Sequence, residues 1–294
     1  MNGIIIIDKP AGWTSFDVVA KLRGALKEKH IGHSGTLDPM ATGVLPIFVG
    51  RATRAIEFCL NSDKEYIAGL KLGLSTDTQD VTGNILSVCE TSVTAEELSD
   101  ILSHFLGAQK QIPPMYSAVK INGNKLYDLA RRGIEVPRPE RDIYISDIKL
   151  LSGEENEFVL KVTCSKGTYI RTLCHDIGRA LGCGGTMSSL RRTRAGAYTI
   201  GMARPLDEVL ELISSGGAAD LPTPVDSVFS EYPHIKLNES ETHRCRNGAP
   251  CRVANTKDGT YRFYGPDDKF LLLGEIKGGS LKVIKGFFSN NDEK

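Results

Sequence analysis

Residues 32–46 read Gly-His-Ser-Gly-Thr-Leu-Asp-Pro-Met-Ala-Thr-Gly-Val-Leu-Pro, and the rest of the chain is interpreted around this stretch. Its glycines, its Ser-Gly step and its Asp-Pro step predict an ordered loop, which runs into an apolar, strand-like segment from Val44 to Val49. Pro39 fixes its own φ and biases Asp38 away from the helical region, so the backbone directs the Asp38 carboxylate. An Asp-Pro step is most often only a turn, so these residues alone leave both a structural and a catalytic role open.

The composition is that of a soluble globular protein. With 294 residues, 40% hydrophobic and 24% charged, the chain can form one large domain and a small one. No run approaches the roughly 20 apolar residues of a membrane span. The apolar run Ile4 to Ile7 is too short for a signal peptide and lacks a basic lead-in. We therefore expect a cytoplasmic protein without a membrane partner.

The cysteines argue against a disulfide framework and against a structural zinc site. There are seven, and they form no Cys-x-x-Cys pair. His243, Cys245 and Cys251 lack a fourth ligand at a suitable spacing. We expect no bound metal and no other cofactor.

Charge is balanced overall but unevenly distributed. The formal net charge is zero, yet seven basic residues and one acid, Asp176, lie between Lys161 and Tyr198. Acids gather elsewhere, around Glu96. This distribution is compatible with a phosphate-binding surface, although a solvated charged face would have the same composition.

Apolar periodicity predicts a mixed α+β domain. The first part is expected to contain a buried strand from Gly3 to Asp8 and a helix capped by Thr14 or Ser15. The apolar positions of that helix follow helical spacing and are expected to face the core. They are Phe16, Val19, Leu22 and Leu26.

Further elements follow along the chain. Thr94 and Glu97 have the spacing of a capping box, which predicts a helix start there. Alternation of apolar residues in the strand from Lys64 to Leu72 places Tyr66 on its apolar face. The other expected elements are a helix at 51–60, strands at 143–151 and 158–164, a helix ending near Leu181 and a helix at 206–213.

Residues 112–142 read as an insertion that clamps RNA and is mobile when empty. Prolines bracket it, an Asn122-Gly123-Asn124 turn lies inside it, and a short helix is expected from Leu126 to Arg132. Basic residues alternate there with Tyr116 and Tyr127. After about residue 228, short strand-like runs separated by turn dipeptides predict a small β-barrel-like module. We expect a catalytic domain at 1–228 and this module at 229–294.

The loop at 32–47 closely resembles the signature of the bacterial tRNA pseudouridine(55) synthases, the TruB family. Similar motifs follow in family order over nearly the whole chain, among them the strings at 8–15, 113–123, 164–171 and 190–192. The resemblance implies a pseudouridine-synthase fold, with a largely antiparallel sheet and flanking helices, followed by an all-β PUA-like RNA-binding domain. It implies a cofactor-independent isomerase that flips uridine 55 out of the T-loop of tRNA and converts it to pseudouridine.

The resemblance also implies roles for individual residues. Asp38 would be the catalytic aspartate, and Arg171 would pair with it and keep it ionised. Tyr66 would stack on the target base, Leu190 would form a wall of the uracil pocket, and Lys9 would pack beside the site. His33 would insert where the flipped nucleotides had been. The expected RNA contacts are His33, Lys64, Lys120, Arg131, Arg132, Lys166, Arg191 and Arg192, with Arg244, Arg246 and Arg252 in the C-terminal module.

Other classes of function stay open at this point. A metal-dependent hydrolase could use Asp38, Asp77, Asp80 and His33, and a non-catalytic RNA-binding protein could use the same basic surface. A guide-RNA-dependent relative is also conceivable, but the continuous insertion at 113–141 favours a stand-alone enzyme. We expect a monomer without an obligate protein partner.

Overall fold

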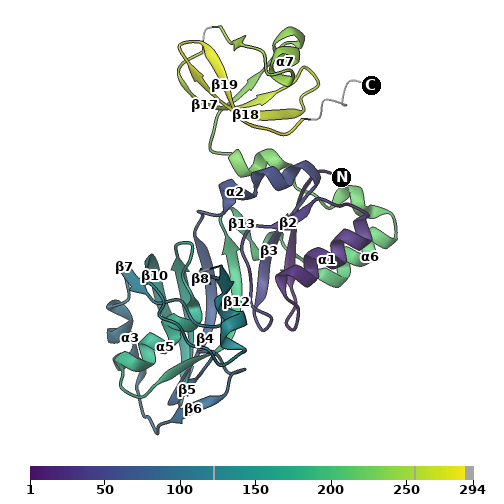
Figure 1. The fold of residues 1–294 in the computed structure, drawn as a ribbon. Helices are drawn as coiled ribbons and strands as arrows, with labels where there is room; N and C mark the ends of the chain where they lie inside the picture. Colours follow the sequence, from purple (N-terminus) through teal and green to yellow (C-terminus); the bar gives the residue numbers. More distant parts are fainter. Residues whose placement is uncertain (122, 255, 289–294) are drawn as a thin grey trace.

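A ten-stranded sheet forms the larger part of the computed structural model, which describes residues 1–121, 123–254 and 256–288 (Figure 1). Its order is β14-β1-β3-β12-β4-β11-β10-β7, with β2 paired to β3 and β13 paired to β12. All pairings are antiparallel except β1 with β14 and β3 with β12. The predicted mixed fold with a largely antiparallel sheet is therefore confirmed. The strands are β1 Gly3–Lys9, β2 Ile31–His33, β3 Thr42–Val49, β4 Lys64–Leu72, β7 Gly107–Gln111, β10 Arg141–Glu154, β11 Glu157–Cys164, β12 Gly185–Ala195, β13 Tyr198–Thr199 and β14 Arg204–Pro205.

The centre of the sheet is a short parallel seam between β3 and β12. Only two residue pairs join these strands, Arg191 with Thr42 and Arg192 with Gly43. Gly43 has a φ of +102°, and a Cβ atom there would lie 2.2 Å from the Arg192 carbonyl oxygen. Only glycine fits this approach. The predicted loop after β2 thus ends at the point where the two halves of the sheet meet.

Helices cover the two halves separately. The helices α1 Ser15–Leu26 and α6 Leu206–Ser214 pack over β1 and β3, whereas α3 Ala95–Ser103 and α5 Ile170–Ala180 pack over the half formed by β4, β10 and β11. The predicted capping box at Thr94 is present, and Thr14, one of the two predicted caps of the first helix, forms a capping box with Asp17. The predicted helix at 51–60 is a 3-10 helix, η1 Gly50–Ala55, followed by one turn of α-helix, α2 Ile56–Cys59.

The prediction for Phe16 was wrong. Its side chain is 67% exposed, and α1 presents Ser15, Val18 and Leu22 to the interior instead. The hydroxyl of Ser15 is bonded to the backbone of Leu37, which fixes the rotation of α1 about its axis. Because neighbouring helical residues point about 100° apart, Phe16 is then directed to solvent.

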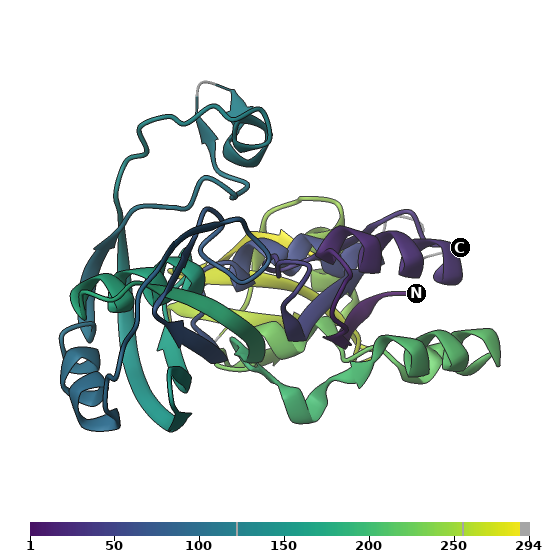
Figure 2. The same cartoon turned by 90° about the horizontal axis from the view of Figure 1, so that it is seen from below.

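The insertion projects away from the sheet (Figure 2). It contains β8 Lys120–Ile121, β9 Asn124–Lys125 and α4 Leu126–Ala130, which lies where the short helix was predicted. Leu126 is fully buried, and the Tyr127 N–H donates to the Ser117 carbonyl. The predicted turn includes Asn122, which lies outside the described residues. A separate hairpin, β5 Leu74–Thr76 with β6 Ile85–Val88, follows β4.

The predicted C-terminal β-module is confirmed, with one helix that was not predicted. Its sheet has the order β15-β17-β18-β19-β16 and its own core, and α7 Glu239–Arg246 packs against β16. Two of the three expected RNA-contacting arginines, Arg244 and Arg246, lie in α7. The strands are β15 His234–Lys236, β16 Cys251–Arg252, β17 Gly259–Tyr264, β18 Phe270–Lys277 and β19 Ser280–Gly286.

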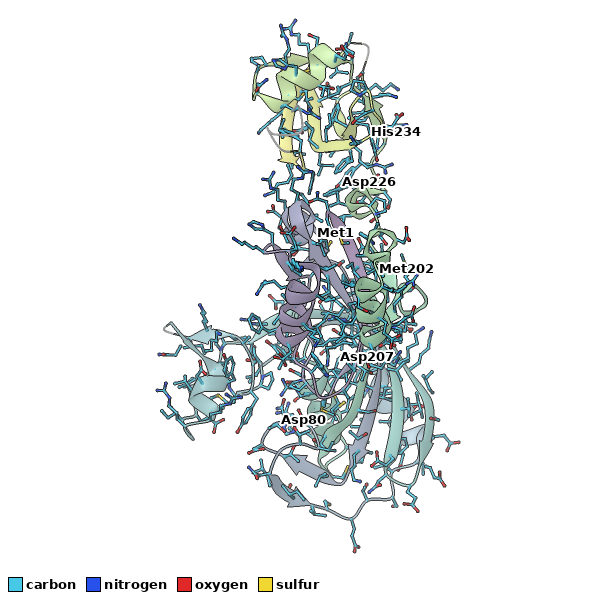
Figure 3. All side chains as sticks on the ribbon, turned by 90° about the vertical axis from the view of Figure 1, so that its right-hand side faces the viewer. Met1, Asp80, Met202, Asp207, Asp226 and His234 are labelled. Carbon is cyan, nitrogen blue, oxygen red and sulfur yellow. The ribbon has the colours of Figure 1, made fainter. Side chains whose placement is uncertain are left out.

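Aromatic side chains join the two sheets. Phe229, at the end of the 3-10 helix η4 Val225–Phe229, lies 5.1 Å from Phe58, 5.9 Å from Phe270 and 5.7 Å from Phe287 between ring centroids. Figure 3 shows the narrow connection, with Asp226 on one side and His234 on the other. The second sheet begins only at His234, and the division predicted at 228/229 falls within η4.

Candidate active site

A cavity of about 980 Å³ lies beside the central seam of the large sheet. The loop at 34–40, the loop at 78–82, the insertion and the segment at 165–171 surround it, and β4 and β12 contribute its floor. Among the predicted site residues, it brings together Asp38, Lys64, Tyr66, Arg131, Lys166, Arg171, Leu190 and Arg192. Lys9, His33, Lys120, Arg132 and Arg191 do not line it.

The loop that carries Asp38 is fixed on both sides of the carboxylate. Before it, the Leu37 N–H donates to the Ser15 hydroxyl over 2.8 Å, and that hydroxyl donates back to the Leu37 carbonyl over 3.2 Å. After it, the Pro39 carbonyl accepts from the Gly12 N–H. The Asp38 side chain, 37% exposed, therefore has a defined direction although it belongs to a loop.

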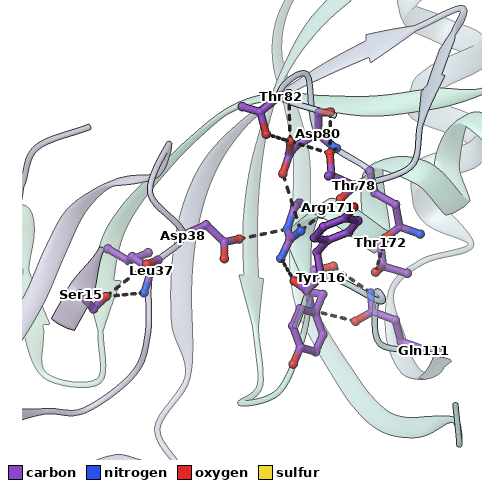
Figure 4. A network of polar contacts seen from close by, with 12 residues as sticks. Ser15, Leu37, Asp38, Thr78, Asp80, Thr82, Gln111, Tyr116, Arg171 and Thr172 are labelled. Carbon is purple, nitrogen blue, oxygen red and sulfur yellow. Dashed lines mark hydrogen bonds and ion pairs between the residues drawn. The ribbon is translucent and has the colours of Figure 1, made fainter. Parts of the chain in front are cut away.

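Arg171 holds the Asp38 carboxylate, as the resemblance implied. Its Nε lies 3.0 Å from the Asp38 Oδ2 (Figure 4). Its Nη1 donates to the Thr78 carbonyl over 3.1 Å, and its Nη2 donates to the Tyr116 carbonyl over 2.9 Å. One buried guanidinium thus connects the Asp38 loop, the loop at 78–82 and the insertion.

Asp80 is a site residue that the sequence interpretation did not assign to the synthase site. It is 5% exposed, and its Oδ2 lies 3.7 Å from the Arg171 Nη1, whereas Asp38 contacts the Nε of the same guanidinium (Figure 4). Its Oδ1 accepts from the Thr78 hydroxyl and from the backbone and hydroxyl of Thr82. The only signal in the sequence was the polar string Thr-Asp-Thr-Gln-Asp at 76–80.

Electrostatics raise the pKa of Asp38 above its ordinary value. Burial is the main cause, the positive charge of Arg171 opposes it, and the negative charge of Asp80 adds to it. Arg171 is thus shared between two carboxylates, and its positive charge offsets the effect of burial on the pKa of Asp38 only in part. The acid limb of any reaction that needs an ionised Asp38 is accordingly displaced to higher pH.

The cavity floor comes from neighbouring positions of two paired strands. Arg192 pairs with Tyr66 and Leu190 pairs with Ala68 in the register of β12 with β4, so these side chains share one face. Tyr66 is 9% exposed, and burial raises the pKa of its phenol, which keeps the hydroxyl protonated. Its predicted place on the apolar face of the strand is confirmed, with Ala68 and Leu70 buried beside it.

Three predicted RNA contacts are occupied within the protein. Arg192 is 1% exposed, and its guanidinium donates to the carbonyls of Val44, Thr36 and Gly35, so it supports the Asp38 loop. Arg191 forms an ion pair with Asp8, with 2.6 Å between Nη2 and Oδ2. The buried Lys64 ammonium donates to the carbonyls of Leu60 and Ser62. Arg192 and Lys64 are therefore buried away from the outer surface, although both line the cavity.

The other predicted contacts lie in different surroundings. Lys120, Arg131, Arg132 and Lys166 are exposed, and Arg131 and Lys166 line the cavity. The Arg131 guanidinium lies 5.5 Å from the centre of the Tyr127 ring, so it is held over an aromatic face. His33 is partly buried on β2, where burial and the nearby Arg192 lower its pKa.

The donor set does not fit the alternative of a metal-dependent hydrolase. The space between Asp38 and Asp80 is filled by the cationic side chain of Arg171. Asp77 is bonded to the backbone and side-chain amide of Asn84. Within residues 1–121, 123–254 and 256–288, no three metal-ligating side chains form a cluster.

Lys9 is fully buried and supports the Asp38 loop by a hydrogen bond to the Pro39 carbonyl. Its ammonium donates to the carbonyls of Pro10, Trp13 and Pro39 over 2.8, 2.6 and 3.3 Å. Burial lowers its pKa to about 8, Asp38 opposes this shift, and Arg192 adds to it. Between about pH 8 and pH 10.5 the unfolded chain therefore binds more protons at Lys9 than the folded chain does.

We expect the contribution of Lys9 to the free energy of unfolding to rise with pH across this window, by up to about 3 kcal/mol. Urea unfolding of the wild type and of Lys9→Met at pH 7.5 and pH 10.5 gives the difference in the free energy of unfolding between the two proteins at each pH. The contributions of other titrating groups cancel in this difference. Lys21→Met, which removes an exposed lysine from α1, controls for the loss of one charge. Equal changes with pH in wild type and Lys9→Met would contradict the expectation.

The fold and the site define a pseudouridine synthase, and comparison with known proteins agrees. The sequence profile described as TruB family pseudouridylate synthase (N terminal domain) matches residues 23–170. The profile described as tRNA pseudouridylate synthase B C-terminal domain matches residues 171–228. The chain belongs to the TruB family of pseudouridylate synthases, and the predicted isomerase class is confirmed.

Curated relatives and solved structures are similar over almost the full length. A tRNA pseudouridine synthase B of Clostridium kluyveri is 42% identical over 293 residues, which are 98% of this chain and 100% of the relative. One from Alkaliphilus oremlandii is 47% identical over 248 residues, 84% of this chain and 82% of the relative. A solved structure described as "Crystal Structure of a Cbf5-Nop10-Gar1 Complex" aligns with a TM-score of 0.73 at 27% identity, covering 97% of this chain and 85% of that chain. In the described residues, no helix is long and apolar enough to span a membrane.

Proposed function

We propose that this pseudouridine synthase acts on tRNA, where it converts uridine 55 of the T-loop to pseudouridine. The observation that carries the proposal is the pairing of Asp38 with Arg171 at a cavity floored by Tyr66 and Leu190. The curated relatives named tRNA pseudouridine synthase B support tRNA as the substrate.

The reaction breaks the C1′–N1 bond of the uridine, turns the uracil and joins C5 to C1′, after which C5 loses its proton and N1 gains one, so that substrate and product are isomers. Positive charge develops at C1′ while the base is detached, as it does at the sugar in glycoside hydrolysis. An ionised Asp38 stabilises this charge or bonds to the carbon. Arg171 keeps the carboxylate ionised and directed, because a guanidinium binds a carboxylate in a fixed geometry.

The cavity provides the surroundings that a detached uracil needs. Tyr66 offers an aromatic face on which a base can stack, and Leu190 forms an apolar wall. The detached base stays in place because these side chains enclose it on two sides. A uridine in a folded loop has to be flipped out to reach this depth, at a cost of a few kcal/mol.

Exposed cations at the rim of the cavity supply phosphate contacts in this proposal. Arg131 on the insertion and Lys166 in the segment at 165–171 line the cavity. Lys120 and Arg132 extend the basic surface of the insertion. His33 and the arginines of the C-terminal module, Arg244, Arg246 and Arg252, are proposed as further contacts. The enzyme is proposed to act as a cytoplasmic monomer, without a metal, a guide RNA or a protein partner.

An unmodified tRNA transcript tests the proposal. We expect purified protein to form pseudouridine at position 55 alone in the presence of EDTA, and a transcript with cytidine at that position to stay unmodified. Mapping of pseudouridine along the transcript gives the site directly. Modification at another position would overturn the proposed specificity, and activity only after addition of cell extract would overturn the stand-alone enzyme.

A further inference from the structure

Gln111 links the start of α5, the helix that carries Arg171, to the beginning of the insertion. It is the last residue of β7 and directly precedes the insertion at 112–142. Its side chain is 4% exposed. A buried amide destabilises the fold unless its donor and its acceptor are both satisfied, so its bonds indicate what this position requires.

Both polar ends of the Gln111 amide bind the backbone of one residue, Tyr169. Its Oε1 accepts from the Tyr169 N–H over 2.8 Å, and its Nε2 donates to the Tyr169 carbonyl over 3.0 Å (Figure 4). The two bonds together fix the direction of the Tyr169 backbone as a neighbouring strand would. With only one of these bonds, the Tyr169 backbone could rotate about that bond relative to Gln111.

Tyr169 is the N-cap residue of α5, and its own side chain makes no capping bond within the described part of the chain. Its carbonyl also accepts from the Leu173 N–H over 3.0 Å, which is the first bond of the helix. Gln111 thus binds the residue at which α5 begins. Arg171 lies two positions further along, in the first turn of that helix.

The start of α5 sets the direction of the Arg171 side chain. The guanidinium reaches Asp38 from there, and on its other side it contacts the Thr78 and Tyr116 carbonyls. A rotation of the first turn would move Nε away from the Asp38 Oδ2. It would also break the bond to Tyr116, which is the contact of Arg171 with the insertion.

We propose that Gln111 is a positioning residue for the reaction: by binding both backbone groups of Tyr169 it fixes the first turn of α5, and thereby holds Arg171 against Asp38. The charged groups that face Asp38 are Arg171 from α5, Asp80 from the loop at 78–82 and Lys9 from β1. Gln111 is neutral, so it acts on Asp38 only through Arg171.

Gln111→Met tests the proposal, because methionine has a similar length and no hydrogen-bonding amide. We expect its single-turnover rate constant at saturating tRNA to fall roughly 10- to 100-fold, whereas the Kd for tRNA changes by less than about threefold. The acid limb of the rate should also move to higher pH, because a displaced Arg171 stabilises the Asp38 carboxylate less. A residue that served stability alone would lower the melting temperature without moving this limb.

Gln109→Met is the matched control. Gln109 lies two residues earlier on the same strand, and its amide also makes two bonds to backbone, donating to the carbonyls of His104 and Leu106, but neither bond reaches the start of α5. We expect its rate constant and its pH profile to match those of the wild type. Gln111→Asn, which keeps a neutral amide one methylene shorter and so cannot make both bonds to Tyr169 in place, should give an intermediate loss of rate.

The proposal is overturned if Gln111→Met and Gln109→Met have the same rate constant, or if the acid limb of Gln111→Met stays in place. Should Gln111→Met fail to fold, the neutral variant Gln111→Asn decides by the same two measurements. This inference rests on the proposed function, because tRNA is the substrate on which the variants are assayed. Failure of that proposal would appear as an inactive wild type, which is distinguishable from an inactive variant.

Discussion

Replacement of Asp38 by Asn is expected to abolish pseudouridine formation and to leave the Kd for tRNA within about tenfold of the wild type. Asn has the shape of Asp and keeps an oxygen for the Arg171 Nε, so the loop and the cavity should be preserved. What is lost is the negative charge beside C1′. Because contacts to phosphates dominate the affinity for RNA, a single carboxylate in the cavity contributes little to binding.

The measurement pairs two assays on the same protein: mapping of pseudouridine in a tRNA transcript, and the Kd for that transcript at fixed salt. Asp77→Asn is a suitable control, because Asp77 lies near Asp80 in sequence but outside the cavity. It should keep full activity. A loss of binding as large as the loss of turnover would show that Asp38 organises the site instead of acting in it.

Arg171→Met is expected to reduce the single-turnover rate by two to three orders of magnitude, since removal of one positioned hydrogen-bond donor from an active site costs about 2.7–4 kcal/mol of transition-state stabilisation. Methionine keeps much of the apolar stem but leaves Asp80 buried without its cation and releases the Tyr116 carbonyl. The pKa of Asp38 should rise further, because the group that opposed the effect of burial is gone. Activity that remains should therefore be lost at a higher pH than in the wild type.

Rates measured between pH 5 and pH 9 report the effect on the ionisation of Asp38, and urea unfolding reports the loss of stability caused by the unpaired Asp80. Arg179→Met is the control, because Arg179 lies on the same helix, is 76% exposed and forms an ion pair with Asp176 three residues away, far in sequence from Asp38. Its rate and stability should change little. An Arg171→Met enzyme with an unchanged pH profile would refute the view that Arg171 controls the ionisation of Asp38.

Local signals in the sequence were sufficient for much of the fold. The capping-box spacing of Thr94 and Glu97 predicts one helix start, and the pair Thr14-Ser15 predicts another to within one residue, since a cap and the backbone it satisfies are about three residues apart. The alternation that places Tyr66 on the buried face is equally local. Asp38 and Arg171 came from the resemblance, because nothing local indicates that residues 133 positions apart meet.

The features that local patterns did not reveal depended on contacts between distant segments. Arg192 looked like a surface residue in a basic string, but that string is the central strand β12, and three carbonyls of the Asp38 loop satisfy its guanidinium. Phe16 fits a helical apolar pattern, but the bond between Ser15 and Leu37 decides how the helix is turned. Asp80 and Gln111 gain their importance from partners on α5.

The aromatic junction around Phe229 bears on how the molecule unfolds. Buried side chains of β1 and β3, among them Ile4 and Phe48, form one cluster with Phe229, Leu273 and Phe287, so the two sheets share part of a single core. Unfolding of the C-terminal module would expose these rings and the face of the catalytic domain that they cover, and burial of such side chains contributes about 1.5–3 kcal/mol each. The two sheets are therefore thermodynamically coupled. Loss of either one withdraws stabilisation from the other, and the chain should melt as one cooperative unit.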